Sequence, residues 1–167
     1  MVTTTGRLAH EVTLRVGEII GEFEKAKTRQ AKKEVLEKYK DVEALRYLLC
    51  GTFDPKIQWA ITEQPDYSED DITPEGEEAN SLYMEMPKCT LFVKDHPAGA
   101  RVKPERLKQI LIQVLESLHP SESKLYMQML KKKSKVKGLT SKLVLEVFPN
   151  TSLHDGHLSL FSKLIIN

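Results

Sequence analysis

The sequence predicts a mainly α-helical protein, a compact multi-helix domain, and three observations lead to this prediction. Apolar residues recur at intervals of three or four along most of the chain, which is the spacing of amphipathic helices. Residues that favour helix starts, such as Thr28, Pro104 and Thr140, stand just before or at the beginning of several of these stretches. The chain has 167 residues, of which 40% are hydrophobic and 29% charged, as expected for one domain with its own core.

This single domain, residues 1–167, divides by composition into four parts. They are N-terminal helices over residues 7–62, an acidic loop over 63–80, C-terminal helices over 81–149 and an apolar extension over 150–167.

The N-terminal part is predicted to form three helices. They are expected over Arg7 to about Ala26, Arg29–Tyr39 and Val42–Cys50. Thr28 is expected to cap the second helix and Asp41 the third, which Gly51 should end. In the first helix, Gly17 and Gly21 lie four residues apart and either allow another backbone to approach closely or are merely tolerated.

Three residues are predicted to be buried for reasons of residue type. Trp59 is the only tryptophan, and core packing is its expected role. Cys50 and Cys89 stand in apolar surroundings without a C-x-x-C spacing, so they are interpreted as buried free thiols in a reducing cytosol.

The acidic loop is predicted to be solvated. Glu63–Glu78 holds eight acidic residues and no basic one. The alternative is a segment that contacts a basic protein partner through Glu69, Asp70 and Asp71.

The C-terminal helices are predicted to contain the central core helix, which runs from Pro104 to Leu118. Its wide apolar face should be buried on more than one side, with Leu111 and Leu115 fully buried. Before it, two short apolar runs within residues 82–93 form either a small β-ribbon or helical turns. After it, the next helix is expected to be capped by a serine, either Ser121 or Ser123.

A dense lysine segment follows that helix. Residues 131–142 hold six lysines and no acid. Gly138 is expected to end the preceding helix at positive φ, and Thr140 to cap a short helix from Ser141 to Phe148 that stops before Pro149. Unpaired N–H groups at the start of this short helix, beside lysines, are the physical arrangement of a phosphate site. The predicted nucleic-acid contacts are Lys131, Lys133, Lys135, Lys137, Gly138, Thr140, Ser141 and Lys142.

The apolar extension contains large side chains such as Leu160 and Phe161. We expect it to pack on this domain or on another chain, because soluble monomers usually avoid an exposed apolar patch of this size.

The sequence carries no motif that predicts an enzyme. P-loop, dinucleotide-binding and G-x-S-x-G motifs are absent. His154 and His157 offer two imidazoles, whereas metal sites need three or four ligands, so neither a metal nor a cofactor is expected. No apolar run approaches the roughly 18 residues of a membrane span, and the N-terminus lacks the apolar core of a signal peptide.

The lysine segment resembles the end of the N-terminal DNA-binding domain of phage ATP-dependent DNA ligases. The matching residues are Lys131, Lys132, Lys133, Val136, Gly138, Leu139, Thr140, Leu143, Val144, Val147, Phe148 and Pro149. A second block, Lys33–Trp59, is similar to a helix pair near the start of these ligases. The resemblance implies a helical scaffold that contacts DNA, but not ligation, because the chain lacks the K-x-D-G lysine that carries the nucleotide. The acidic loop departs from the ligase pattern.

Two blocks also resemble a group of small proteins of contractile-tailed phages and cyanophages that have no established function. They are L-R-x-x-L-x-G-x-F-D at Leu45–Asp54 and K-G-[LI]-T-x-K at Lys137–Lys142. This resemblance implies a phage protein that acts in the cytoplasm of the infected bacterial host or in the virion.

Two functions follow from these patterns. The favoured one is a non-enzymatic module that binds the DNA phosphate backbone without reading base sequence, because lysines contact phosphates rather than base edges. The alternative is a virion component or an interaction factor that binds a phage or host protein through the acidic loop and the apolar extension.

Overall fold

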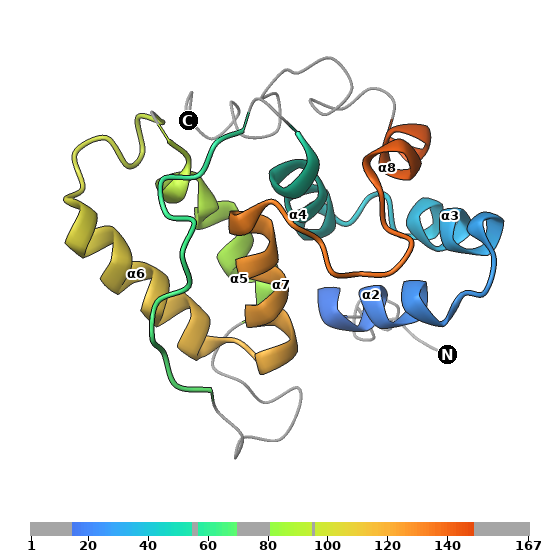
Figure 1. Cartoon of the computed structure of the whole chain (residues 1–167), viewed down its shortest axis with the longest axis horizontal. Coiled ribbons are helices and arrows are strands. Elements are labelled where there is room, and N and C mark those ends of the chain that lie inside the picture. The colour runs from blue at the N-terminus through green and yellow to red at the C-terminus, as the bar shows by residue number, and fades with distance from the viewer. Residues whose placement is uncertain (1–14, 55–56, 70–80, 95, 149–167) are drawn as a thin grey trace, which may run out of the picture.

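The structure is a computed structural model, and it describes residues 15–54, 57–69, 81–94 and 96–148. Its helices are α2 (Val16–Lys25), α3 (Arg29–Lys38), α4 (Glu43–Phe53), α5 (Leu82–Glu85), the 3-10 helix η1 (Met86–Phe92), α6 (Pro104–Ser117), α7 (Pro120–Lys131) and α8 (Ser141–Val147). These residues contain no strand, and their single β-bridge joins Trp59 to Val93. The predicted mainly α-helical, multi-helix fold is therefore confirmed (Figure 1).

Helices α4 and α7 pack against each other in the middle of the molecule (Figure 1). Eight of the eleven residues of α4 are buried, so neighbours cover it on most sides. The prediction that the Pro104–Leu118 helix is central is wrong. In α6, Leu111 and Leu115 are buried as expected, but Glu105, Lys108 and Glu116 face solvent. The width of an apolar stripe shows how much surface a helix buries, but not how many elements cover it.

The other helices flank this central pair on two sides. Helices α2, α3 and α8 lie on one side, and α5, η1 and α6 lie on the other (Figure 1). The buried side chains of both sides join in one hydrophobic cluster, in which Trp59 is 5% exposed. The predicted core role of Trp59 is thus confirmed, and its indole N–H donates to the carbonyl of Gly51 at 3.0 Å.

Residues 82–93 form helical turns, so the β-ribbon that we considered is wrong. Leu82, Met86, Cys89 and Val93 are all buried, and their spacing of three or four residues brings them to one side of a helical segment. Burial alone does not decide this, because a ribbon turning at residues 87–88 would also bring these four residues to one face; the helical backbone of 82–92 decides it.

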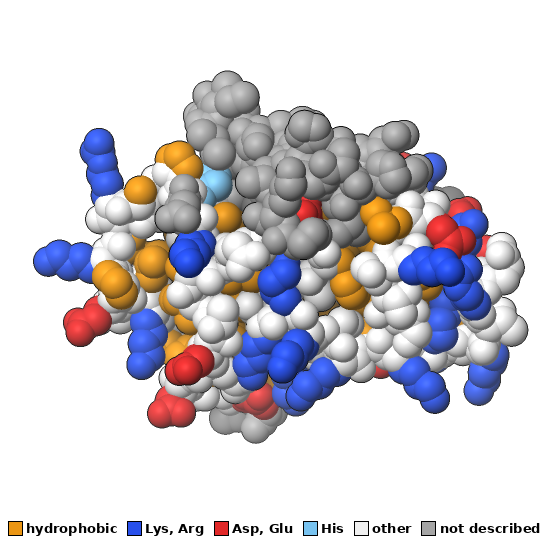
Figure 2. All heavy atoms as spheres, turned by 45° about the horizontal axis from the view of Figure 1, so that its top comes forward, with side chains coloured by type: hydrophobic (Ala, Val, Ile, Leu, Met, Phe, Trp, Pro, Cys, Tyr) orange, Lys and Arg blue, Asp and Glu red, His pale blue; other side chains and the backbone are white. Residues whose placement is uncertain are grey.

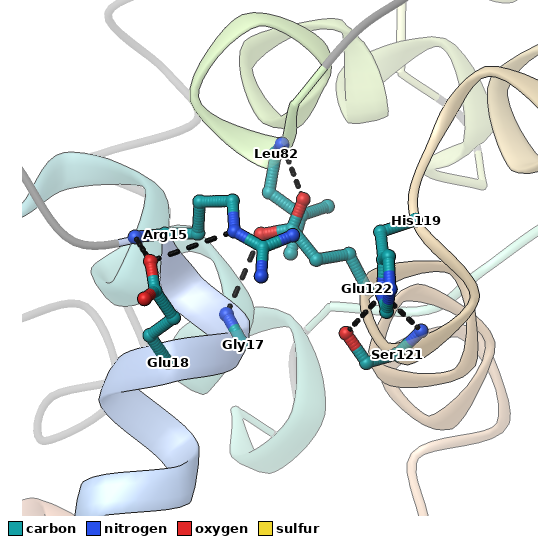
Figure 3. Close-up of polar contacts among 7 residues, drawn as sticks. All are labelled: Arg15, Gly17, Glu18, Leu82, His119, Ser121 and Glu122. Atoms are coloured by element: carbon teal, nitrogen blue, oxygen red, sulfur yellow. Dashed lines mark hydrogen bonds and ion pairs between the residues drawn. The ribbon is translucent and has the colours of Figure 1, made fainter. Parts of the chain in front are cut away.

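A buried carboxylate joins the ends of three helices (Figure 3). Glu122, near the start of α7, is 1% exposed. Its two oxygens accept hydrogen bonds from the backbone N–H of Gly17 in α2 and of Leu82 in α5, each at 3.4 Å. A carboxylate is favoured there, because the first N–H groups of a helix have no partner within the helix and carry partial positive charge.

The same junction shows what surrounds the glycines of α2, and among the described residues no other backbone approaches either of them as one interpretation expected. A Cβ atom at Gly17 would lie 3.1 Å from Ser121 Oγ, so this glycine allows a close approach by side chains of α7. A Cβ atom at Gly21 would meet nothing within 4 Å, so glycine is merely tolerated there.

Three helix boundaries differ from the prediction. Arg15 is extended, so α2 starts at Val16 and the predicted helix from Arg7 is not continuous. Helix α4 starts at Glu43 without a side-chain cap, so Asp41 does not cap it. Helix α7 is capped by His119, whose Nδ1 accepts from the backbone N–H of Ser121 at 3.1 Å, so neither Ser121 nor Ser123 is the cap.

Gly51 lies inside α4 rather than ending it, since the helix continues to Phe53. A Cβ atom at Gly51 would lie 2.7 Å from atoms of Met129 and from the Trp59 ring. We expect Gly51→Ala to destabilise the protein by about 1–3 kcal/mol, because the side chains that would have to move are themselves buried. Gly21→Ala is the matched control and should stabilise the protein by up to about 1 kcal/mol, because alanine is the better helix residue in open space. Denaturant unfolding of both variants tests this, and equal effects would contradict it.

Both cysteines are buried and free, as predicted. Burial raises the pKa of the Cys89 thiol well above its usual value, so this side chain behaves as a small apolar group. In the described parts of the chain, no helix is long and apolar enough to cross a membrane.

Candidate nucleic-acid interface

The lysine segment begins where α7 ends, at a residue with left-handed backbone. Lys132 has φ 54° and ψ 38° and is the C-cap of α7. The prediction that Gly138 ends this helix is therefore wrong. Gly138 does have the expected positive φ, 84°, but it forms a turn before α8.

The side chain of Lys132 returns to the interior and binds the end of α4. Its Nζ donates to the carbonyl oxygens of Gly51, Asp54 and Ile57 at 3.2, 2.6 and 2.8 Å. These carbonyls lie at or beyond the C-terminal end of α4, where partial negative charge favours a cation. An ammonium group has three hydrogens, which matches three acceptors.

Lys132 is thus a structural residue, although it stands within the lysine segment. Burial lowers the pKa of its ammonium group, and the Asp54 carboxylate raises it to a smaller extent. The sequence does not distinguish Lys132 from its neighbours Lys131 and Lys133, because its role depends on a contact with residues about eighty positions earlier.

The other lysines of the segment point into solvent. Lys131, Lys133, Lys135 and Lys137 are exposed. None of them forms an ion pair with a carboxylate that belongs to the described residues. The segment itself is anchored, since Val136 and Leu139 are buried in the core cluster. Four lysine ammonium groups are therefore presented from a fixed stretch of backbone.

The predicted cap of α8 is confirmed. Thr140 Oγ1 accepts from the backbone N–H of Leu143 at 3.2 Å. Gly138, Thr140, Ser141 and Lys142 are all exposed, so they lie at the surface beside the lysines. The seven-residue α8 is short, and one of its first N–H groups already bonds the cap, so its N-terminus alone is a weak anion site.

The turn at Gly138 lies directly on α3. A Cβ atom at Gly138 would be 2.9 Å from Cδ and Cε of Lys32. The ammonium group of Lys32 donates to the carbonyl oxygen of Phe23 at 3.0 Å and lies 4.8 Å from the Phe23 ring centroid. The lysine segment and the basic helix α3 are therefore neighbours. In Figure 2, Lys and Arg side chains gather along the lower edge, from the middle of the molecule toward the side of α3.

The acidic residues proposed for a protein partner are only partly described. Glu69 is exposed, and the residues just before it contact α6 and α7. The backbone N–H of Ser68 donates to Glu116 Oε2 at 2.8 Å, and the Tyr67 hydroxyl lies 3.4 Å from Ser123 Oγ near the start of α7. Glu69 is thus placed toward the end of α7 opposite the lysine segment. Asp70, Asp71, Leu160 and Phe161 lie outside the described residues.

A family model described as a family of unknown function, DUF6433, matches residues 19–136. The chain belongs to this family. The matched region runs from Ile19 in α2 to Val136, so it includes the α4–α7 core, Lys132 and the first half of the lysine segment. No curated protein and no solved structure matches the chain. The resemblance to the ligase domain and to the phage proteins therefore stays a prediction.

The candidate interface can bind an anion. It contains ammonium groups, hydroxyls and backbone N–H groups, and all of these are donors that suit phosphate oxygens. In the described parts of the chain, no group of three His, Cys, Asp or Glu residues is close enough to hold a metal ion.

Proposed function

We propose that this protein is a non-enzymatic module that binds DNA through the phosphate backbone, independently of base sequence. The observation that supports this best is the row of exposed lysines, Lys131, Lys133, Lys135 and Lys137, which have no carboxylate partner among the described residues. Unneutralised ammonium groups release condensed counterions when they meet phosphates, and this release drives sequence-independent binding.

The anchoring of the segment supports the proposal further. Lys132 ties one end of the segment to α4, and Val136 and Leu139 tie the other end to the core. A fixed backbone loses little conformational entropy on binding, so more of the electrostatic gain appears as affinity. The side chains keep their freedom, which suits a phosphate backbone better than base edges.

The position of the described part of the acidic loop is compatible with an anionic ligand at the lysine segment. Ser123, which Tyr67 contacts, precedes Lys131 by eight residues of helix, or about 12 Å at 1.5 Å per residue. The Debye length is about 10 Å at 0.1 M salt, so repulsion from Glu69 is largely screened at the lysine segment.

The setting of this function follows from the phage resemblance. We propose the cytoplasm of the infected bacterial host as the place of action, with a role in DNA metabolism, and the virion as the second possibility.

The salt dependence of binding tests the proposal. Fluorescence anisotropy with a labelled duplex should show the logarithm of affinity falling linearly with the logarithm of salt concentration. Three to five phosphate contacts should give a slope of about −2.7 to −4.5 on duplex DNA and a shallower slope on a single strand. Duplexes of different sequence should bind equally. Absence of binding to both forms at low salt would refute the DNA function, and a partner protein bound through Glu69, Asp70, Asp71, Leu160 or Phe161 would then take its place.

A further inference from the structure

One carboxylate lies among three basic side chains at the junction of α3 and α8. Glu146, in the last turn of α8, accepts hydrogen bonds from both terminal nitrogens of Arg29, one of them at 3.4 Å. Lys33 Nζ lies 3.9 Å from Glu146 Oε1. Lys142 lies one helical turn before Glu146 and so shares its side of α8. Lys33 Nζ also lies 4.0 Å from Glu37 Oε1, so the two carboxylates together leave one positive charge of the cluster uncompensated.

We propose that Arg29, Lys33 and Lys142 form a second phosphate-binding patch of the DNA surface, and that Glu146 is an internal anion that competes with the phosphate for them. This inference rests on the proposed function. It adds α3, which the sequence did not indicate, to the elements that contact DNA. It also predicts that the Glu146 carboxylate lowers the affinity for DNA.

The chemistry of the cluster supports the competition. A guanidinium group binds the two oxygens of a carboxylate with the same fork that it uses for two oxygens of a phosphate. The three basic groups hold the pKa of Glu146 below its usual value, with the Arg29 hydrogen bond as the main cause, so the competing carboxylate is ionised at neutral pH.

A phosphate can reach the cluster and displace the carboxylate at small cost. The side chains of Arg29, Lys33 and Glu146 are 56%, 28% and 35% exposed. Ion pairs with this exposure contribute only about 0–1 kcal/mol, because water and salt screen them. Dissociation of Glu146 from Arg29 therefore opposes DNA binding only weakly.

The cluster is continuous with the lysine segment. Gly138 rests on the aliphatic part of Lys32, which is adjacent to Lys33 in α3. Thr140 starts α8 two residues before Lys142. A DNA strand that follows the lysines to Gly138 therefore arrives at α3 and α8, where the next basic groups are those around Glu146.

The test compares two single neutralisations of the same size. Glu146→Gln removes the competing charge from the cluster, whereas Glu34→Gln removes an exposed charge of the neighbouring helix α3 that has no ion pair with another described residue. Anisotropy titrations with one labelled duplex should show that Glu146→Gln binds about two- to fivefold more tightly than the wild type. Glu34→Gln should change affinity less than twofold. Equal increases in affinity from both variants would overturn the inference, because the affinity would then depend only on the net charge of the protein.

A second variant tests the contacts themselves. Arg29→Gln combined with Lys33→Gln should reduce the magnitude of the salt slope by about 1.8, which corresponds to two lost phosphate contacts. Thermal melts check that the fold is retained. If the wild type binds DNA and this double variant keeps the full slope, the second patch is refuted while the proposed function stands. If the wild type binds no DNA, both are refuted together.

Discussion

Lys133→Glu combined with Lys137→Glu is expected to abolish DNA binding without unfolding the protein. Both side chains are exposed and have no carboxylate partner among the described residues, so their reversal removes no internal contact. The change alters the interface by four units of charge. Each unit of charge contributes about 1 kcal/mol to binding at contact distance in water. The binding free energy should therefore weaken by about 4 kcal/mol, which is about a thousandfold in affinity.

The matched control reverses two lysines on the other side of the molecule. Lys103→Glu combined with Lys108→Glu makes the same charge change at the start of α6, where both side chains are exposed (Figure 1). Anisotropy at low salt should show nearly wild-type affinity for this control. Comparable losses in the two double variants would mean that binding follows net charge and that the lysine segment is not the interface. Circular dichroism melts establish that both variants fold.

Lys132→Met is expected to lower the free energy of unfolding by about 2–4 kcal/mol. Methionine keeps the length of the aliphatic stem but removes three hydrogen bonds to the carbonyls of Gly51, Asp54 and Ile57. Hydrogen bonds from charged groups contribute about 1.5–3 kcal/mol each. The expected loss of stability is smaller than three times this value for two reasons. Burial of the ammonium group has its own cost, which is seen in its lowered pKa. The carbonyl of Gly51 also keeps its hydrogen bond from the Trp59 indole.

The adjacent lysine provides the control for this prediction. Lys131→Met removes an equal charge at an exposed position and should change stability by less than about 0.5 kcal/mol. Urea unfolding followed by tryptophan fluorescence suits the measurement, because Trp59 contacts Gly51 at the same end of α4. If Lys131→Met and Lys132→Met have equal effects, the contact between α7 and α4 contributes nothing to stability.

Local signals in the sequence predicted much of the helical structure. Thr28 caps α3 and Thr140 caps α8 as expected, since a threonine hydroxyl acts on N–H groups two or three residues away. Pro104 opens α6, because its fixed φ suits the first helical turn. The positive φ of Gly138 and the burial of Leu111 were likewise predicted, the first from residue type and the second from helical spacing.

The arrangement of the charged residues was decided by tertiary structure. Lys132 has the same sequence surroundings as the lysines beside it, yet it alone binds the end of α4, because its left-handed backbone turns its side chain toward that helix. Arg29 and Glu146 are 117 positions apart, so no local pattern pairs them.

By itself, the sequence determined which of the longer stretches are helical, where α3, α6 and α8 start and that one stretch is dense in lysine, because these properties depend on residues within a few positions of each other. Only the tertiary structure decided that α4 rather than α6 is central, that Lys132 is internal while its neighbours face solvent, and that α3 lies beside the lysine segment. The physical reason is that burial and pairing depend on distances in space between residues far apart in the chain, and the folded backbone alone sets those distances.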